Sequence, residues 1–392
     1  MVTPILVAMS VTMEVHGFCD EKFAQVRDLF EKNFEELGDI GASFAATVDG
    51  EFVVDLWGGH ADLAKTRPWE EDTIVNVYST TKTMSFICAL LLADRGELDF
   101  NAKVGDYWPE YATNGKETTE VRHFLSHSAG VPGFDPKFTE VGPLYDWNAC
   151  VENLAAQAPW WEPGAQSGYH AITQGYLIGE IVRRISGKTI GSFFRDEIAG
   201  PLGADFHIGM PDDVFPRVAE MIPDTPDPDA PSPFGELDPN AIPARVFASA
   251  PADTDAVNTP DWRRAEIPAA GGHGNARAVV RAQTPLANGG SAFGVELMSP
   301  AGCARMQEEQ TNGPDAVLFL PIRFGLGYAF PNDAMPMSPN DNAMFWGGAG
   351  GSTIVVDQPA HVCLSYVMNQ MRSGIVGDTR GGRLGKAFYE AL

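Results

Sequence analysis

The stretch Val77–Leu98, VYSTTKTMSFICALLLADRGEL, places a lysine three residues after a serine at the start of a long apolar segment. Ser79 is a favourable helix N-cap, and the residues after Lys82 are apolar on most sides, which predicts a buried helix. Residues three apart share one helix face, so the hydroxyl and the amine are expected side by side in the first turn. The helix dipole and the apolar surroundings both favour a neutral amine, which can activate a hydroxyl as a nucleophile.

The same pair has a second interpretation, without chemistry. An N-cap serine followed by a lysine that extends to solvent would give the same letters, and a pattern this short also occurs by chance. The choice depends on whether other parts of the chain supply what a serine nucleophile needs. These needs are a proton acceptor and two hydrogen-bond donors for the oxyanion.

The composition of the 392-residue chain is that of a globular protein, with 44% hydrophobic and 20% charged residues. The net charge of −25 argues against nucleic acid or an anionic membrane as a partner, because both require clustered lysine and arginine. The five cysteines include no C-x-x-C pair and are expected to be free thiols, which favours a cytoplasmic location. Because no lysine or arginine precedes Lys22, a secretion signal is not expected.

Strand patterns lie at both ends of the chain. Residues 42–59 form two apolar runs separated by Asp49-Gly50, which predicts a hairpin, and residues 343–371 indicate two or three further antiparallel strands. Helices are predicted for residues 20–37 and 382–392, and residues 174–187 predict a helix that ends at a glycine. We therefore expect an α+β fold in which both chain ends build one antiparallel sheet, flanked by helices.

The middle of the chain is expected to form a second, mostly helical domain inserted into the first. The predicted boundaries are 19–81 with 287–392 for the sheet domain and 82–286 for the helical domain. Residues 210–268 are rich in proline and aspartate and are expected to shape a binding cleft or to form a surface excursion. Residues 1–18 are expected to be an N-terminal extension.

Two later stretches can complete a serine site. Tyr169 lies just before the predicted helix, in a loop that contains Gly164 and Gly168. The small residues of Trp346-Gly347-Gly348-Ala349 form a strand edge where a substrate can approach the backbone closely. No G-x-S-x-G elbow accompanies His127, His170 or His273, so a Ser-His-Asp hydrolase is not supported.

In their order along the chain, these motifs resemble those of the serine β-lactamase-like hydrolases, and in particular the family VIII carboxylesterases, which look like class C β-lactamases and DD-peptidases. Ser79-Thr80-Thr81-Lys82 matches the S-x-x-K motif, which implies Ser79 as nucleophile and Lys82 as its partner. Tyr169-His170-Ala171 is similar to the Tyr-x-Asn motif, with Ala171 in the place of the asparagine. The blocks HFLSHSAGVPGF (123–134) and GGHGNARAVVRA (271–282) also resemble the family.

The third family motif, Lys-Thr-Gly, is replaced. Trp346-Gly347-Gly348 stands in its position, and none of the three Lys-Thr pairs in the chain continues into glycine. A lysine there would be the natural counter-charge for a substrate carboxylate, whereas Trp346 offers an apolar face. The replacement therefore favours a neutral ester as the substrate, bound at Trp346, Gly347 and Gly348.

The resemblance implies a serine carboxylesterase that hydrolyses short-chain esters through an acyl-enzyme on Ser79. It implies an oxyanion hole made of the Ser79 and Ala349 N–H groups, and neither a metal nor a cofactor is expected. Either Lys82 or Tyr169 is the general base. The alternatives are a β-lactamase, a DD-peptidase or D-amino-acid peptidase, an acyltransferase on the same fold, and a non-catalytic module of the penicillin-binding type.

Overall fold

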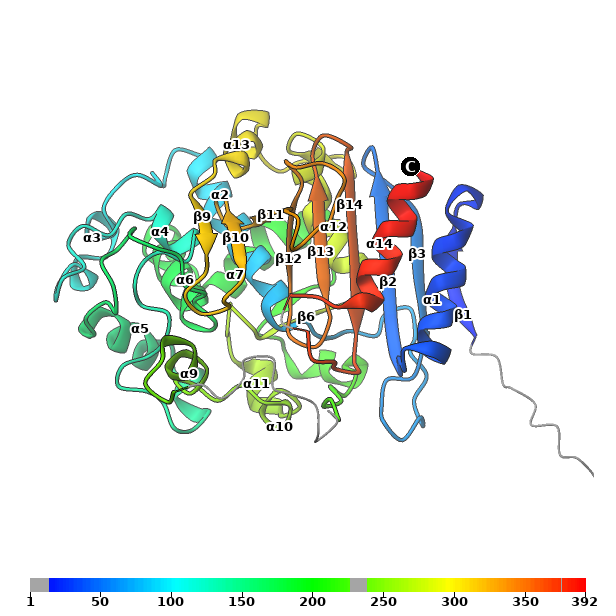
Figure 1. Ribbon diagram of the computed structural model, residues 1–392, viewed down its shortest axis with the longest axis horizontal. Helices are drawn as coiled ribbons and strands as arrows, with labels where there is room; N and C mark the ends of the chain where they lie inside the picture. The colour runs from blue at the N-terminus through cyan, green and yellow to red at the C-terminus, as the bar shows by residue number, and fades with distance from the viewer. Residues whose placement is uncertain (1–13, 226–237, 375) are drawn as a thin grey trace, which may run out of the picture.

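The protein is described by a computed structural model that covers residues 14–225, 238–374 and 376–392. A nine-stranded antiparallel sheet runs through it, in the order β1-β3-β2-β14-β13-β12-β11-β10-β9 (Figure 1). Its strands are β1 Val15–Cys19, β2 Gly41–Val48, β3 Glu51–Gly59, β9 Thr311–Pro314, β10 Pro321–Phe324, β11 Ala329–Phe330, β12 Met344–Gly347, β13 Thr353–Asp357 and β14 Val362–Met368.

The two ends of the chain join at the centre of this sheet. Strand β14 pairs antiparallel with β2 over seven residues, from Val362 opposite Val48 to Met368 opposite Ala42. The expected sheet built from both chain ends is therefore confirmed. Strand β1 pairs with β3, so the sheet already begins at Val15, inside the segment predicted as an extension, and residues 1–13 of that segment lie outside the described part.

Helices cover both faces of the sheet. Helices α1 (Ala24–Glu36) and α14 (Thr379–Ala391) pack against each other on one face, and Figure 1 shows them side by side in front of the strands. The rings of Phe23 and Phe388 stack there, with centroids 4.5 Å apart. Helix α12 (Ala276–Ala287) packs on β2, β13 and β14, so it is part of the sheet layer although its residues were assigned almost entirely to the helical domain.

The remaining helices all lie between β3 and β9 in the sequence. Helix α2 (Thr81–Asp94) is buried from Thr81 to Leu92 and packs against α6 (Thr173–Ser186), which ends as predicted at Gly187 with a φ of 73°. The other α-helices are α3 Val104–Tyr107, α4 Arg122–Leu125, α5 Trp147–Ala156, α7 Ile190–Phe194, α8 Gly200–Leu202, α9 Ile242–Phe247, α10 Thr254–Val257, α11 Pro260–Arg264 and α13 Pro300–Ala304.

Two small sheets complete the fold. Strands β4 (Val75–Asn76), β6 (Gly272–Gly274) and β5 (His207–Ile208) form one of them, and β7 (Ser291–Ala292) with β8 (Val295–Glu296) forms the other. The first sheet ties the residues just before Ser79 to the block at 271–282. It thereby fixes the entry to α2 from outside the helix.

A buried ion pair holds the C-terminal helix to the rest of the molecule. One guanidinium nitrogen of Arg380 lies 2.7 Å from Asp39 Oδ1, and their side chains are 2% and 0% exposed. A second guanidinium nitrogen donates to the carbonyl of Gly350 at 2.6 Å, and Tyr366 donates to Asp39 Oδ2 at 2.6 Å. Loss of one partner from such a pair typically costs about 3–5 kcal/mol, because a buried charge is left uncompensated.

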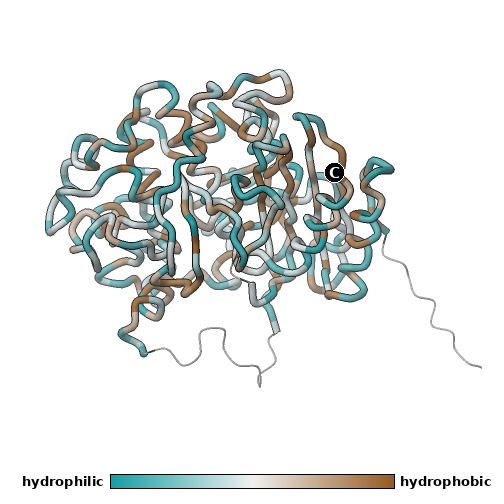
Figure 2. The backbone as a smooth tube through the Cα atoms, turned by 45° about the horizontal axis from the view of Figure 1, so that its top comes forward, coloured by the Kyte–Doolittle hydropathy of each residue, from teal (hydrophilic) through white to brown (hydrophobic). Residues whose placement is uncertain are grey.

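Hydropathy follows these layers. Hydrophobic residues gather in the inner strands and helices, while polar residues dominate the outer loops (Figure 2). Among the described residues, no helix has the length and apolar character needed to cross a membrane.

Candidate active site

Ser79 lies in a short 3-10 turn, Tyr78–Thr80, directly before α2. The expected N-cap role is wrong, because α2 begins at Thr81 and its cap residue, Thr80, makes no side-chain capping bond. The turn is set up by Tyr78, which has a φ of 43°, a region that non-glycine residues rarely adopt. The Tyr78 N–H donates to Asn76 Oδ1 at 2.9 Å and holds this conformation. The Ser79 hydroxyl is thus left for other partners.

Lys82 is fully buried one turn further along. Its Nζ lies 3.1 Å from Ser79 Oγ and donates to the carbonyls of Ala171 at 2.7 Å and Ala269 at 3.0 Å. Burial lowers the pKa of Lys82 well below its ordinary value, because no carboxylate compensates for the lost hydration. Burial thus favours the neutral form of this amine, and two main-chain carbonyls fix its position.

Tyr169 approaches the serine from the opposite side. Its hydroxyl donates to Ser79 Oγ at 2.6 Å, and its ring centroid lies 4.8 Å from Lys82 Nζ. Burial raises the pKa of Tyr169 well above its usual range, and the nearby Ser79 hydroxyl and Trp346 indole only partly oppose this. The phenol is therefore protonated. Lys82, from the same motif as Ser79, and Tyr169, from a separate motif, thus meet at the Ser79 oxygen.

The turn after β12 comes close to the Ser79 backbone. A Cβ atom added to Gly348 would lie 3.2 Å from the Ser79 nitrogen and 2.2 Å from the Val77 carbonyl oxygen, so only glycine fits there. Ser352 Oγ donates to the same Val77 carbonyl at 2.9 Å and fastens the turn to the segment before α2. Ala349 follows Gly348 in this turn. A hydrogen bond from the Gly351 N–H to the Gly348 carbonyl, 3.2 Å long, closes the turn.

The amides of Ser79 and Ala349 are available as donors. Neither N–H makes a hydrogen bond to another group within the described ranges, and Ser79 is in the first turn of its helix, where N–H groups lack intrahelical partners. One of these unpaired amides is on Ser79 itself and the other is in the turn that contacts the Ser79 backbone, and unpaired amides are the donors that an oxyanion hole uses.

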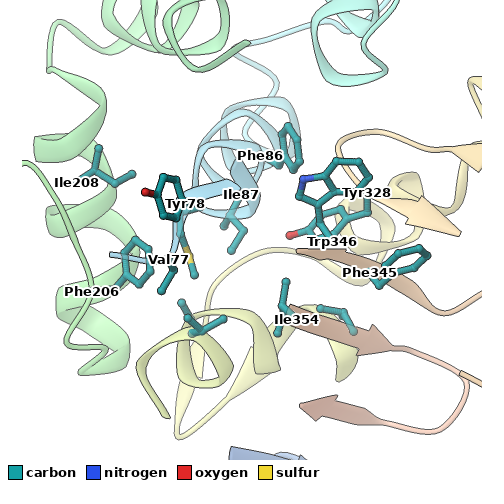
Figure 3. Close-up of a cluster of buried hydrophobic side chains, with 14 of the residues drawn as sticks. Val77, Tyr78, Phe86, Ile87, Phe206, Ile208, Tyr328, Phe345, Trp346 and Ile354 are labelled. Carbon is teal, nitrogen blue, oxygen red and sulfur yellow. The ribbon is translucent and has the colours of Figure 1, made fainter. Parts of the chain in front are cut away.

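Trp346, expected to offer an apolar face to the substrate, is almost fully buried. Its side chain is 1% exposed, its ring centroid is 5.4 Å from that of Tyr169, and its indole N–H has no hydrogen-bond partner among the residues described. In Figure 3, Phe86 and Ile87 of α2 lie between Trp346 on one side and Val77 and Tyr78 on the other. Gly347 is enclosed by backbone atoms of Ser352, Val376 and Gly377.

The histidines do not form a serine triad. No hydrogen bond joins His127, His170 or His273 to Ser79, and burial lowers the pKa of His170 and His273 to about 3. Within the described ranges, no three His, Cys, Asp or Glu residues are grouped closely enough to hold a metal ion.

Some functional groups gave no signal in the sequence. Ala171 and Ala269 contribute main-chain carbonyls, which the side-chain letters do not report. The block at 271–282 supports the site in the same way, since the Gly272 N–H donates to Thr81 Oγ1 at 2.9 Å and its carbonyl accepts from the Val77 N–H at 2.9 Å. Asp315, a buried acid whose Oδ1 accepts the Tyr169 N–H at 3.0 Å, was recognisable only as an isolated acid beside an apolar run.

Comparison with known proteins places this arrangement in a family. The Beta-lactamase family model matches residues 30–384. The chain belongs to the beta-lactamase family. This confirms the resemblance to serine β-lactamase-like hydrolases that the motifs indicated, and the α+β fold expected from the sequence is the β-lactamase/transpeptidase-like fold of this family.

Individual relatives cover almost the whole chain. The esterase/beta-lactamase LipL of Mycobacterium tuberculosis is 35% identical, over 95% of this chain and 86% of the relative. A crystal structure of a family VIII carboxylesterase superposes with a TM-score of 0.90 at 40% identity, covering 97% of this chain and 100% of the other. A penicillin-binding protein homologue from Caulobacter crescentus gives a TM-score of 0.89 at 40% identity, with the same coverage.

Proposed function

We propose that this member of the beta-lactamase family is a serine carboxylesterase that hydrolyses short-chain, neutral carboxylic esters through an acyl-enzyme on Ser79. The observation that carries the proposal is the set of contacts around Ser79 Oγ. This oxygen accepts a hydrogen bond from the Tyr169 hydroxyl at 2.6 Å and lies 3.1 Å from the buried Lys82 amine. The similarity to LipL and to a family VIII carboxylesterase supports an ester as the substrate.

In the first step, Lys82 is the general base. A neutral amine has two N–H groups, and the carbonyls of Ala171 and Ala269 occupy both. The remaining lone pair faces the Ser79 hydroxyl and takes its proton as Oγ attacks the ester carbonyl carbon. The resulting oxyanion is held by the Ser79 and Ala349 N–H groups, and one such donor contributes about 3 kcal/mol in other hydrolases.

In the second step, Tyr169 is the general acid. Its protonated phenol gives a proton to the departing alkoxide as the tetrahedral intermediate collapses to the ester of Ser79. The proton held on Lys82 then restores the phenol. Water attacks the acyl carbon in the same manner, releases the carboxylic acid and regenerates the Ser79 hydroxyl. Hydrolysis is thereby complete with groups of this chain alone.

The identity of the third motif favours neutral substrates. Trp346 of β12 stands where a lysine would hold a substrate carboxylate, and burial disfavours the charged form of Lys82 by lowering its pKa, which supports a neutral substrate. A β-lactam is the second candidate, supported by the double name of LipL. An acyltransferase would use the same acyl-enzyme and differ only in the acceptor. The free thiols of the chain favour a reducing compartment such as the cytoplasm.

The first experiment tests the nucleophile. Ser79→Ala should abolish hydrolysis of p-nitrophenyl butyrate while the protein remains folded, because the hydroxyl makes no capping bond and its loss removes only the contacts with Tyr169 and Lys82. Mass spectrometry after reaction with a serine-directed phosphonate should locate the adduct on Ser79. Ser291→Ala, at an exposed serine of β7, is the matched control and should retain full activity. An adduct on a different serine would refute the mechanism.

The second experiment tests the substrate class on one preparation. We expect kcat/KM for p-nitrophenyl butyrate to exceed that for nitrocefin and for a D-Ala-D-Ala peptide by far more than tenfold. A tenfold ratio corresponds to only about 1.4 kcal/mol, less than one charge-assisted hydrogen bond can contribute. Equal efficiency on nitrocefin would make the protein a β-lactamase with the same catalytic groups, and a burst of one equivalent without turnover would indicate a binding module.

A further inference from the structure

The block HFLSHSAGVPGF (123–134) has no role in the proposed chemistry, yet its second histidine, His127, lies against the site. His127 is 1% exposed and has a φ of 57°, a strained conformation that a non-glycine residue keeps only where its surroundings hold it. Strain of this kind is concentrated at functional sites. The contacts of His127 therefore need an explanation beyond packing.

These contacts enclose Tyr169 on both sides along the chain. The main-chain carbonyl of His127 accepts the Gly168 N–H at 2.9 Å, and its Nδ1 accepts the His170 N–H at 3.0 Å. Between them, the Tyr169 N–H donates to Asp315 Oδ1 at 3.0 Å. Three consecutive amides are thus fixed, two of them by one residue. The left-handed conformation is what lets the carbonyl and the imidazole of His127 reach the same segment.

The imidazole also contacts the phenol ring itself. The ring centroids of His127 and Tyr169 are 4.9 Å apart, and Phe324 packs on His127 at 4.8 Å. Because Nδ1 accepts a hydrogen bond, the single proton of the neutral ring is on Nε2. Burial holds the pKa of His127 well below its usual value. A ring that stays neutral orients its neighbour and does not exchange protons.

We propose that His127 is a positioning residue for Tyr169, which it holds so that the phenol oxygen stays 2.6 Å from Ser79 Oγ. This inference rests on the proposed function, because it assigns His127 an effect that passes through the Tyr169 hydroxyl. Displacement of a catalytic group by about 1 Å can cost on the order of 100-fold in rate. The loss of one of the two holding bonds is therefore expected to reduce kcat and to leave KM nearly unchanged.

Two substitutions separate the hydrogen bond from the backbone conformation. His127→Asn retains an acceptor oxygen at the position of Nδ1, and His127→Gly removes it, while both residues tolerate a positive φ. We expect kcat of His127→Gly to fall about 10- to 100-fold and that of His127→Asn to stay within about tenfold of the unmodified enzyme. His361→Gly, at an exposed histidine with a φ of 54°, is the matched control and should leave kcat unchanged. If the glycine variant does not fold, His127→Asn decides alone, because a fall in its kcat of more than about tenfold despite the retained acceptor would overturn the proposal.

A double-substitution cycle then shows whether the effect passes through the phenol. In a Tyr169→Phe background, His127→Gly should change the rate of phosphonate labelling at Ser79 by less than twofold, since the hydroxyl to be positioned is gone. The same loss in both backgrounds, or an unchanged kcat in His127→Gly, would overturn the proposal. A failure of Ser79 to label in the unmodified enzyme would instead refute the proposed function, so the two failures are distinguishable.

Discussion

At the scale of single residues, one physical effect gives Lys82 and Tyr169 different tasks. Both side chains are removed from water, and burial disfavours whichever form is charged. It therefore lowers the pKa of the amine and raises that of the phenol. In the proposed mechanism, this effect supplies a base and an acid on two sides of the same Ser79 oxygen.

The first prediction concerns the protonation of Lys82. The amine is the active form, so kcat/KM should rise with pH through the lowered pKa of Lys82 and then stay level through pH 9, because Tyr169 keeps its proton there. Lys82→Arg should reduce kcat by about 10²- to 10⁴-fold, since a guanidinium does not lose its proton in proteins. The measurement is the pH profile with p-nitrophenyl butyrate, corrected for spontaneous hydrolysis.

Lys116 provides the matched control for that substitution. It is 1% exposed, and like Lys82 its amine donates to two main-chain carbonyls, those of Ala155 and Gln157. Lys116→Arg should therefore disturb packing to a similar extent and retain kcat. Activity that falls as the pH rises from 7 to 9, or an active Lys82→Arg variant, would exclude Lys82 as the base.

The sequence was informative at this scale where side chains carry the chemistry. The Ser-x-x-Lys spacing predicted that Ser79 and Lys82 lie together, and the order of the motifs added Tyr169. It said nothing of the Ala171 and Ala269 carbonyls, because any residue type supplies a carbonyl. It also proposed Trp346 as an apolar surface for substrate, whereas its side chain is almost fully buried.

At the scale of elements, the site is built where two chain segments meet through their backbones. Gly348, after β12, touches the turn before α2 so closely that no side chain fits between them. This contact joins the turn that carries the Ala349 amide to the segment that carries the Ser79 amide. The distance between β12 and α2 therefore controls the geometry of the proposed oxyanion hole.

The second prediction tests that contact with a pair of glycine substitutions. Gly348→Ala should lower kcat by on the order of 100-fold, because a Cβ 2.2 Å from the Val77 carbonyl oxygen forces the two segments apart. Gly382→Ala, in α14, meets nothing within 4 Å and should keep kcat while stabilising the protein by about 0.5–1 kcal/mol. Activity assays and urea unfolding measure the two effects. Full activity in Gly348→Ala would rule out an oxyanion hole at this position.

Local signals were sufficient for several elements. The Asp49-Gly50 turn and the end of α6 at Gly187 follow from backbone preferences of the residues themselves, and the structure has both where they were expected. The start of α2 does not follow from them. Tyr78 adopts a positive φ, which the hydrogen bond from its N–H to Asn76 Oδ1 supports and which its residue type does not predict, and this moves Ser79 from the cap position into a 3-10 turn.

At the scale of the whole molecule, the chain closes on itself through one sheet. The pairing of β2 with β14 was predictable, because strand patterns occur at both ends and the motif order matches the family. The placement of α12 was not predictable, since an amphipathic pattern shows that one face is buried but not against what. Helix α12 covers the sheet, and Ala269, in the segment just before it, provides a carbonyl that accepts a hydrogen bond from Lys82.

The last prediction follows from the net charge of −25 and from the absence of a lysine in the third motif. A negative molecule repels an anionic substrate, and this site offers it no counter-charge. We expect kcat/KM for p-nitrophenyl butyrate to exceed that for p-nitrophenyl hydrogen succinate, which has the same chain length and one negative charge. Raising the salt from about 0.1 to 1 M shortens the screening length from about 10 to 3 Å, so the ratio should shrink while the neutral ester, the internal control, changes little. Equal efficiencies at low salt would show that a cation of this chain reaches the substrate carboxylate, and the preference for neutral esters would then have to be abandoned.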